Sequence, residues 1–230
     1  MGTTALITGG SGGLGQGVTA AFLDAGWRVV VPWITEAELE LLPEHNNLHT
    51  VRADLFEAAD AERAATLAAS DGDAPLGAVL NLVGGFAMSG RVHETDIAEF
   101  EQQLRLNLRP TYLTSQAALP HLIANGGGSI ACVSSRAALR PFSGAAGYIT
   151  GKAAVLSLVD AMAAEYKRDN VRVNAVLPSV IDTPGNRASQ PDADHSKWVS
   201  PAEIARVLLF LCAPDSGVVS GAHVPVYGTG

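Results

Sequence analysis

Short apolar runs alternate with longer amphipathic runs along almost the whole chain. Each apolar run is bounded by glycine, proline, asparagine or aspartate, and most are apolar at successive positions rather than at every second one. Such continuous runs are typical of strands in a parallel sheet that is covered on both faces. We therefore predict about seven strands, at Thr4–Thr8, Arg28–Trp33, Leu48–Arg52, Ala78–Val83, Ser129–Ser134, Arg172–Leu177 and Ala222–Val226.

The amphipathic runs between these strands predict helices. Pro201 follows Ser200 and precedes Glu203, which indicates a helix start because proline is favoured at the first helical position. The predicted helices are Gly13–Ala25, Thr35–Leu42, Glu57–Ala69, Asp96–Ala124, Tyr148–Asp169 and Pro201–Cys212. Strands and helices in alternation imply right-handed crossovers, and hence an α/β fold with a doubly wound parallel sheet flanked by helices on both faces.

The chain shows no internal repeat, linker or low-complexity segment, so residues 1–230 are predicted to form a single domain. The one long stretch without a predicted element is Pro178–Ser200, which is rich in proline and polar residues. A loop of this length inside a compact domain is usually functional or disordered. Because it follows the carboxyl end of a strand, we predict that residues 178–200 form a lid on the substrate side.

The composition narrows the class of protein. With 47% hydrophobic and 17% charged residues the chain is not of the disordered type. The net charge of −8 and only 15 scattered lysines and arginines argue against nucleic acid as a partner. No apolar run approaches the roughly 20 residues that a membrane-spanning helix needs. Two cysteines and an N-terminus unlike a secretory signal lead us to expect a cytoplasmic protein without a membrane or nucleic-acid partner.

A glycine-rich segment, Thr8-Gly9-Gly10-Ser11-Gly12-Gly13-Leu14-Gly15, follows the first predicted strand and opens the first predicted helix. Glycine permits a positive φ and a close approach by pyrophosphate, and the helix N-terminus supplies free N–H groups with a partial positive charge. An ordinary tight turn would also use glycine, but the strand–turn–helix context favours a dinucleotide site. The sequence therefore predicts a Rossmann-like sheet with a bound dinucleotide.

A second motif supplies groups for proton transfer. Tyr148 and Lys152 are four residues apart on a predicted helix, so their side chains share one face. A phenol has a pKa of about 10, and a neighbouring ammonium favours its anion. Ser135 lies just past a strand end, where its hydroxyl can bind a substrate oxygen. The tyrosine–lysine spacing says little alone, but its order with Ser135 and the glycine turn predicts one catalytic cluster.

These motifs together resemble the short-chain dehydrogenase/reductase family, and the resemblance spans essentially the whole chain. The spacing Thr-Gly-x-x-x-Gly-x-Gly is similar to that family's glycine turn, and Asn107 matches its fourth catalytic residue beside Ser135, Tyr148 and Lys152. The resemblance implies hydride transfer between nicotinamide and a carbonyl or secondary alcohol. Tyr148 would exchange the proton, Lys152 would favour the phenolate and hold the ribose, and Asn107 would support a relay water.

The same resemblance implies which residues bind the cofactor. Asn81-Leu82-Val83-Gly84 is similar to the family's motif after the fourth strand, and Asp54 and Thr183 match residues beside the adenine and the carboxamide. Ser179 stands where the family usually has glycine. The expected cofactor contacts are Gly9, Ser11, Gly12, Gly13, Leu14, Gly15, Trp33, Asp54, Leu55, Asn81, Val83, Gly84, Tyr148, Lys152, Pro178, Val180, Ile181 and Thr183.

The choice between NAD and NADP stays open at this stage. An acid or an arginine directly after the second strand normally decides it. Here those places fall at Trp33 and Ile34, which can neither accept a hydrogen bond from the ribose 2′-hydroxyl as an acid does nor bind a 2′-phosphate as an arginine does. Arg28 and Arg52 are candidate phosphate partners, although a salt-bridged or solvated arginine is the simpler interpretation.

The substrate loop carries a narrower resemblance. The run Thr183-Pro184-Gly185-Asn186-Arg187 and the downstream Trp198 are similar to the loop of dihydropteridine reductases, as is Gly84-Gly85-Phe86. The expected substrate contacts are therefore Ser135, Phe86, Arg187 and Trp198. Because dihydropteridine reductases lack the catalytic serine that Ser135 supplies here, carbonyl chemistry is favoured over pterin chemistry.

Three functions remain as hypotheses at the level of the sequence. The first is a reductase or dehydrogenase for a ketone or secondary alcohol, for which a 3-oxoacyl thioester is a plausible substrate. The second is pterin reduction, and the third is a dinucleotide-binding protein without turnover. The long helices around Asn107 and after Tyr148 are rich in alanine and leucine beyond one stripe, which predicts a homodimer or homotetramer. His45 and His49 lack a third ligand, so no metal site is expected.

Overall fold

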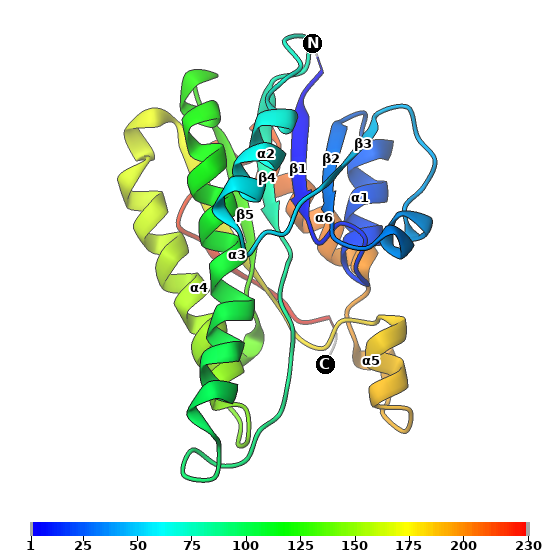
Figure 1. Cartoon of the computed structure of the whole chain (residues 1–230), viewed down its shortest axis with the longest axis vertical. Helices are drawn as coiled ribbons and strands as arrows, with labels where there is room; N and C mark the ends of the chain where they lie inside the picture. The colour runs from blue at the N-terminus through cyan, green and yellow to red at the C-terminus, as the bar shows by residue number, and fades with distance from the viewer. Residues whose placement is uncertain (1, 229–230) are drawn as a thin grey trace.

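The computed structural model describes residues 2–228 and contains one parallel sheet of seven strands (Figure 1). The strand order is β3-β2-β1-β4-β5-β6-β7. The strands are β1 (Thr4–Thr8), β2 (Arg28–Trp33), β3 (Leu48–Arg52), β4 (Leu76–Asn81), β5 (Gly128–Val133), β6 (Val171–Pro178) and β7 (His223–Val226). The doubly wound sheet is confirmed; the predicted bounds hold for β1, β2 and β3 and are shifted by one or two residues in the others.

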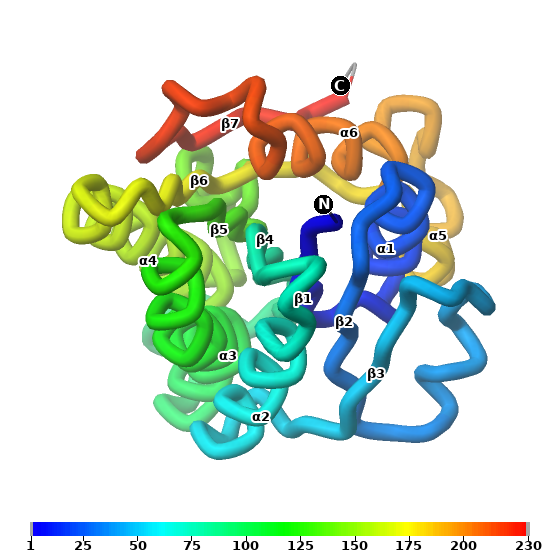
Figure 2. Tube along the Cα trace, turned by 90° about the horizontal axis from the view of Figure 1, so that it is seen from above, coloured from blue at the N-terminus to red at the C-terminus, as the bar shows by residue number. Residues whose placement is uncertain are grey.

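Helices cover both faces of the sheet, as the view from above shows (Figure 2). One face is covered by α1 (Gly15–Asp24) and α6 (Pro201–Cys212), and the other by α2 (Ala58–Ala68), α3 (Ile97–Ala124) and α4 (Ala146–Glu165). Alternate side chains of a strand feed the two cores, because successive residues of a strand point to opposite faces. Leu6 packs with residues of α2, α3 and α4, whereas Ala5 and Ile7 pack with residues of α1 and α6.

Local details of the structure differ from the sequence-based expectations. The strand Leu48–Arg52 is not apolar on both faces: it is the edge strand, and His49, Thr50 and Arg52 are exposed. The helix predicted over Thr35–Leu42 is present as a 3₁₀ helix, Glu36–Leu41.

The loop Pro178–Ser200 is not without structure, since it contains α5 (Pro184–Ser189) and a 3₁₀ turn, His195–Lys197. Thr183 caps α5 by accepting a hydrogen bond from the Asn186 N–H. Pro184 at the first turn suits this start because its missing N–H would have no partner there. The predicted Tyr148–Asp169 helix begins earlier, at Ala146, and ends at Glu165, with a separate 3₁₀ turn at Lys167–Asp169.

The strand order reverses between β1 and β4, since the chain runs from β1 outward to β3 and then crosses to β4 on the other side. In a doubly wound sheet this reversal leaves a crevice at the carboxyl ends of the two strands, where ligands bind. The glycine-rich turn follows β1, and the segment Leu82–Gly84 follows β4. Both therefore lie at this crevice. Within residues 2–228 no helix has the length and apolarity that crossing a membrane requires.

Candidate active site

The glycine-rich turn forms a tight cradle between β1 and α1. Gly9 has a φ of 66°, and its carbonyl accepts a hydrogen bond from the Gly12 N–H at 3.0 Å. A Cβ on Gly15 would overlap the Gly9 carbonyl, so no other residue fits there. Within residues 2–228 the N–H groups of Gly13 and Leu14 have no acceptor, although they lie at the start of α1. The turn thus presents free donors in the way that phosphate binding requires.

The exit of β4 lies directly beside this cradle. A Cβ on Gly9 would be 3.3 Å from the Val83 backbone nitrogen. Thr8 joins the two strand ends, because its hydroxyl donates to the Leu80 carbonyl at 3.2 Å and accepts from the Leu82 N–H at 3.1 Å. The expected contacts after β1 and after β4 are therefore brought together.

Below this exit, Asn81 is fully buried. Its amide donates to the Ser115 hydroxyl at 3.0 Å, while its side-chain oxygen has no partner in the described part of the chain. An unpartnered buried oxygen is costly and marks a position where a ligand or a water completes the hydrogen bonding. Asn81 therefore links β4 to α3 at the base of the crevice, and its side-chain oxygen is left to accept a hydrogen bond.

Asn107, from the middle of α3, clamps the loop after β4. Its side-chain oxygen accepts from the Gly85 N–H at 3.1 Å, and its amide donates to the Gly85 and Gln103 carbonyls, each at 3.0 Å. Both amide N–H groups are therefore used by the backbone, and only one oxygen lone pair is left for a water. The expected water-holding role of this side chain is restricted accordingly.

Ser135, Tyr148 and Lys152 converge from two elements. Ser135 follows β5, and its hydroxyl accepts from the Ala137 N–H at 3.1 Å, whereas Tyr148 and Lys152 share one face of α4. The Lys152 ammonium is buried and donates to the Val133 carbonyl at 3.0 Å. A Cβ on Gly84 would lie 2.7 Å from the Lys152 Nζ and 2.8 Å from the Asn107 Oδ1. The glycine after β4 is thus the point at which α3, α4 and the cradle meet.

The pKa values in this cluster follow from burial. Burial lowers the pKa of Lys152 from 10.5 to about 8, although the nearby Cys132 thiol acts in the opposite direction. Burial raises the pKa of Tyr148, and the Ser135 hydroxyl beside it lowers the pKa only in part. Without a ligand the phenol is therefore protonated at neutral pH. The expectation that Lys152 by itself favours the phenolate is not seen here, since the ammonium is turned to the Val133 carbonyl.

The sequence prediction missed one residue beside the cradle, Glu38. Trp33 ends β2 and Ile34 follows it, as expected, but the 3₁₀ helix after them places the Glu38 carboxylate 3.0 Å from the Ser11 hydroxyl. The signal that could have found it is Thr35-x-x-Glu38, a helix-start pattern in which the glutamate turns back on the first residues. Glu38 is the only acid that the described residues bond to the glycine-rich turn.

Asp54 and Leu55, expected beside the adenine, lie after the neighbouring strand β3. The Asp54 side chain accepts from the Phe56 N–H at 3.0 Å and so shapes the turn into α2. The Leu55 side chain is buried in the apolar core on the α2 face, which leaves its backbone as the part that can reach a ligand. These two residues are placed at the crevice edge, but their side chains have structural partners.

The loop after β6 returns to the glycine turn. Pro178 is buried at the end of β6, Val180 is exposed, and Ile181 forms a bridge with Val199. Thr183 is the contact with the cradle, because a Cβ on Gly13 would lie 2.9 Å from the Thr183 Cβ. The loop therefore covers the start of α1.

Of the expected substrate contacts, Phe86 lies beside Tyr148, whereas Arg187 and Trp198 bind other residues of the loop. The Phe86 ring packs edge-on against the Tyr148 ring at 5.0 Å between centroids, and 55% of Phe86 is exposed. The Phe142 ring lies 6.3 Å from the Phe86 ring, so a second aromatic side chain adjoins the one that packs on the tyrosine. Arg187 is held by both oxygens of Asp182, and Trp198 packs against His195. Phe86 is thus joined to the cluster, whereas Arg187 and Trp198 have partners within the loop.

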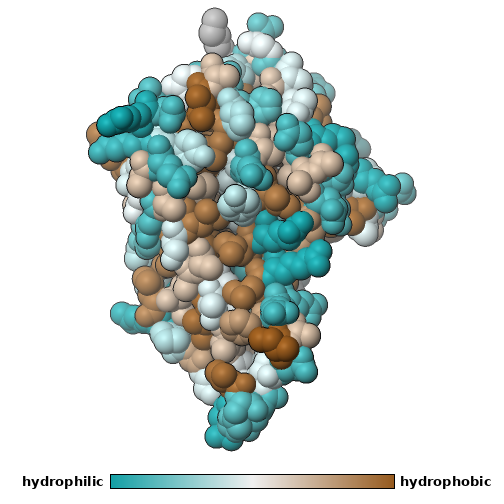
Figure 3. Space-filling model, turned by 60° about the vertical axis from the view of Figure 1, so that its left-hand side comes forward, coloured by the Kyte–Doolittle hydropathy of each residue, from teal (hydrophilic) through white to brown (hydrophobic). Residues whose placement is uncertain are grey.

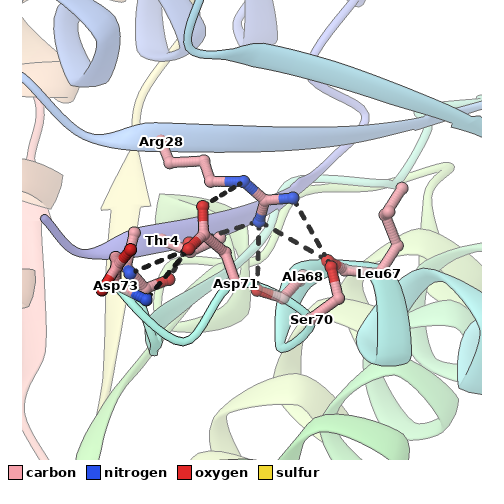
Figure 4. A network of polar contacts seen from close by, with 8 residues as sticks. Thr4, Arg28, Leu67, Ala68, Ser70, Asp71 and Asp73 are labelled. Carbon is pink, nitrogen blue, oxygen red and sulfur yellow. Dashed lines mark hydrogen bonds and ion pairs between the residues drawn. The ribbon is translucent and has the colours of Figure 1, made fainter.

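Arg28 lies at the amino end of β2, whereas the crevice lies at the carboxyl ends of the strands; Figure 4 shows the polar contacts that Arg28 makes there. Its guanidinium donates to the Leu67 and Ala68 carbonyls at the end of α2 and forms an ion pair with Asp71 at 3.6 Å. It therefore stabilises the end of a helix and is not available to a phosphate in the cradle.

These observations fit a bound dinucleotide. The cradle offers free N–H donors where a side chain would not fit, and the crevice continues to a buried ammonium and a phenol. For a metal ion, in contrast, residues 2–228 contain no group of three or more histidine, cysteine or carboxylate side chains that could hold one.

Known proteins of related sequence and structure match this chain over nearly its whole length. A profile described as short chain dehydrogenase matches residues 3–194. The chain is 30% identical over 249 residues to 2-(R)-hydroxypropyl-CoM dehydrogenase of Xanthobacter autotrophicus, covering 99% of this chain and 98% of that protein. It is 30% identical over 240 residues to 2,5-dichloro-2,5-cyclohexadiene-1,4-diol dehydrogenase LinX of Sphingobium indicum, covering 99% and 95%. The solved structure of 3-ketoacyl-(acyl-carrier-protein) reductase from Brucella melitensis complexed with NADH matches with a TM-score of 0.87 at 26% identity, covering 99% and 97%.

Proposed function

Because the chain belongs to the short-chain dehydrogenase family and is an NAD(P)-dependent oxidoreductase acting on a ketone or secondary alcohol, we propose that Tyr148 is its acid–base group. The observation that carries the proposal is the convergence on Gly84, which joins the dinucleotide cradle to Lys152 and Asn107. The nicotinamide ring, when bound, exchanges a hydride with the substrate carbon. The residues of the chain have to orient the substrate oxygen and move its proton.

Tyr148 suits the direction of carbonyl reduction. Since burial raises the pKa of the phenol, it is protonated at neutral pH and can donate to a carbonyl oxygen. Ser135 lies beside it, and its hydroxyl can donate a second hydrogen bond to the same oxygen. In the oxidative direction the phenol has to lose its proton first, so that direction requires a higher pH.

Lys152 and Asn107 support this cluster in different ways. One ammonium N–H of Lys152 is taken by the Val133 carbonyl, and two remain for ribose hydroxyls. Its lowered pKa of about 8 leaves it mostly charged at neutral pH. We assign Asn107 a positioning role, because it fixes Gly85 and thereby the loop that contains Gly84 and Phe86.

The remaining cofactor contacts are proposed as follows. The cradle residues Gly9, Ser11, Gly12, Gly13, Leu14 and Gly15 hold the phosphates, with Asn81, Val83 and Gly84 beside them. Trp33, Asp54 and Leu55 border the adenosine, and Pro178, Val180, Ile181 and Thr183 border the nicotinamide. Residues 1–230 then act as one domain with residues 178–200 as the lid. Support for the lid is the contact of Thr183 with Gly13.

An apolar substrate is supported by the surface next to the tyrosine. Phe86, which packs on the Tyr148 ring, is 55% exposed, and Phe142 beside Phe86 is 46% exposed. Exposed aromatic side chains beside a polar group are typical of a small-molecule site. A 3-oxoacyl thioester as substrate stays a prediction, as do the substrate contacts of Arg187 and Trp198. Pterin reduction is not favoured, because the relatives named above are dehydrogenases of other substrates.

Replacement of Tyr148 by phenylalanine tests the proposal. We expect kcat to fall by about 10²- to 10⁴-fold, because a positioned acid contributes that much, while the dissociation constant for NADH or NADPH stays unchanged. Tyr166→Phe, at the opposite end of α4, is the matched control and should keep full activity. If Tyr148→Phe turned over cyclic and open-chain ketones at the wild-type rate, the proposal would be contradicted. Tyr148 would then not be the acid–base group.

We also propose that the chain forms a homodimer or homotetramer through α3 and α4. The face of these helices carries apolar side chains at its surface (Figure 3). A shallow groove between the helices is lined by Leu104, Arg105, Leu108, Arg109, Tyr112, Ala154 and Leu158. Exposed apolar surface on two long helices is typical of a subunit interface. Sedimentation at the mass of one 23.7 kDa chain would contradict this proposal.

A further inference from the structure

The glycine-rich turn and the segment after β2 are joined by one side-chain contact. The Ser11 hydroxyl donates to the Glu38 Oε2 at 3.0 Å. Ser11 is 4% exposed and stands in the middle of the turn, whereas Glu38 comes from the 3₁₀ helix Glu36–Leu41. The 3₁₀ helix therefore holds a carboxylate against the glycine-rich turn, which itself contains no acidic residue.

The carboxylate is held at both oxygens. Its Oε1 accepts from the Thr35 N–H at 3.1 Å, the Thr35 hydroxyl at 3.0 Å and the Ile34 N–H at 3.4 Å. Burial alone raises the pKa of Glu38, but the hydrogen bonds from Thr35, Ser11 and Ile34 together lower it. The group is thus ionised at neutral pH. A carboxylate oxygen has two lone pairs, so Oε2 can accept one further hydrogen bond.

Glu38 lies where the two nicotinamide dinucleotides differ, near the expected place of the adenosine ribose. In dinucleotide-binding sheets, the adenosine ribose lies between the glycine turn and the end of the second strand. Trp33 and Ile34 stand at that strand end and carry no charge. Glu38, anchored to both the turn and the Ile34–Thr35 backbone, brings a negative charge to the same place.

No competing cation is directed there within residues 2–228. Arg28 is bound to the end of α2, at the amino-terminal end of β2 and thus at the opposite end of the strand from Trp33. Arg52 ends β3 opposite Trp33 and is exposed, and its charge contributes, after Arg63, to the lowered pKa of Asp60 in the first turn of α2. Glu38 itself has no lysine or arginine partner in this part of the chain.

Resting on the proposed function, we propose that the Ser11–Glu38 pair selects NAD(H) over NADP(H). The free lone pair of Glu38 accepts a hydrogen bond from the ribose 2′-hydroxyl. A 2′-phosphate offers no such donor at neutral pH, and it places at least one further negative charge against the carboxylate. Like charges placed against each other at a binding site raise the dissociation constant by about 100-fold or more.

Direct titration of the full-length protein with NADH and with NADPH, followed by nucleotide fluorescence, tests the proposal without a turnover assay. We expect NADH to bind on the order of 100-fold more tightly than NADPH. Glu38→Gln keeps the size of the side chain and removes its charge, and should reduce this preference to about tenfold or less. The change should come mainly from tighter NADPH binding. Glu40→Gln, an exposed acid on the same 3₁₀ helix, is the matched control and should leave the preference unchanged.

A second pair of probes carries no nicotinamide. Adenosine 2′,5′-bisphosphate should displace NADH much less well than adenosine 5′-monophosphate in the wild type, and about equally well in Glu38→Gln. Circular dichroism and the urea midpoint establish that Glu38→Gln is folded. High salt should weaken the discrimination against the 2′-phosphate, because salt screens partly exposed charges.

The outcomes are distinct. Tighter binding of NADPH than NADH by the wild type, or equal effects of Glu38→Gln and Glu40→Gln, would overturn the inference and leave the oxidoreductase proposal intact. Failure to bind either dinucleotide would overturn both. A preference for NADH that collapses only in Glu38→Gln supports the inference.

Discussion

Replacement of Lys152 by methionine is expected to stabilise the folded chain at neutral pH although it removes a proposed active-site residue. The Lys152 side chain is buried, and its pKa falls from 10.5 to about 8 on folding. Burying the charged form of this side chain therefore costs about 3 kcal/mol below pH 8. Methionine has a similar length and carries no charge, but it loses the hydrogen bond to the Val133 carbonyl, which is worth about 1 kcal/mol. The net expectation at pH 7 is a gain of about 2 kcal/mol in the free energy of unfolding.

The sign of this effect depends on pH. Below about pH 8 the lysine is charged in both states, so the full cost of burial is present. Between pH 8 and 10.5 the folded state is neutral and the unfolded state is charged, so the cost shrinks by about 1.4 kcal/mol per pH unit. Above pH 10.5 both states are neutral, and only the lost hydrogen bond remains. The wild type and Lys152→Met should therefore be equally stable near pH ~10.

Urea denaturation of both proteins at several pH values between neutral and pH 10.5, without cofactor, measures this difference. Cofactor is omitted because its binding to the folded state would add to the stability of the wild type. Lys167→Met is the matched control, since Lys167 is exposed and its replacement should show no such pH dependence. A stability difference between wild type and Lys152→Met that stays constant over this range would refute the argument from burial.

Two further changes probe separate parts of the molecule. Arg28→Met should lower the free energy of unfolding by about 2 kcal/mol, because it removes charge-assisted hydrogen bonds to the last carbonyls of α2, while the dissociation constant for NADH stays unchanged. Urea denaturation and NADH titration measure the two effects, and weaker NADH binding would show that Arg28 acts on the crevice after all. Phe86→Ala removes an aromatic wall beside Tyr148 and should raise KM for a bulky aromatic ketone by about tenfold with little change for a short aliphatic one. Equal effects on both ketones in steady-state assays would place Phe86 outside the substrate site.

The sheet could be predicted from the sequence because its strands are short continuous apolar runs, and in a covered parallel sheet both faces of a strand need apolar residues. Leu6 and Ile7 illustrate this, since neighbouring residues enter opposite cores. The edge strand β3 departs from the pattern because one of its sides has no neighbour, and His49 and Arg52 are tolerated there. The helix after β2 could be predicted, but not that it is a 3₁₀ helix, because the periodicity of a few residues cannot distinguish the two types.

The candidate site could be predicted only where its parts are close in sequence or form a motif. Tyr148 and Lys152 follow from helical spacing, and the cradle follows from its glycines. The pattern Thr35-x-x-Glu38 predicts that Glu38 turns back on Thr35, but not that it reaches Ser11 across 27 positions. Phe86 likewise reaches Tyr148 from a different element. Such contacts depend on how elements pack, and a pattern within one element does not determine that.

Gly84 shows how the site and the stability of the chain are linked. Any side chain at this position would meet the Lys152 ammonium and the Asn107 amide, so the crevice stays open only because the residue after β4 has none. The space it leaves brings a buried ammonium to the end of the dinucleotide cradle, where phosphate or ribose oxygens can share its two free N–H groups. Without such a ligand the ammonium is only partly compensated by the Val133 carbonyl, which is why its pKa falls. We therefore expect the folded chain without cofactor to be less stable than a chain with an apolar residue at position 152, and part of that free energy to be recovered when the cofactor binds.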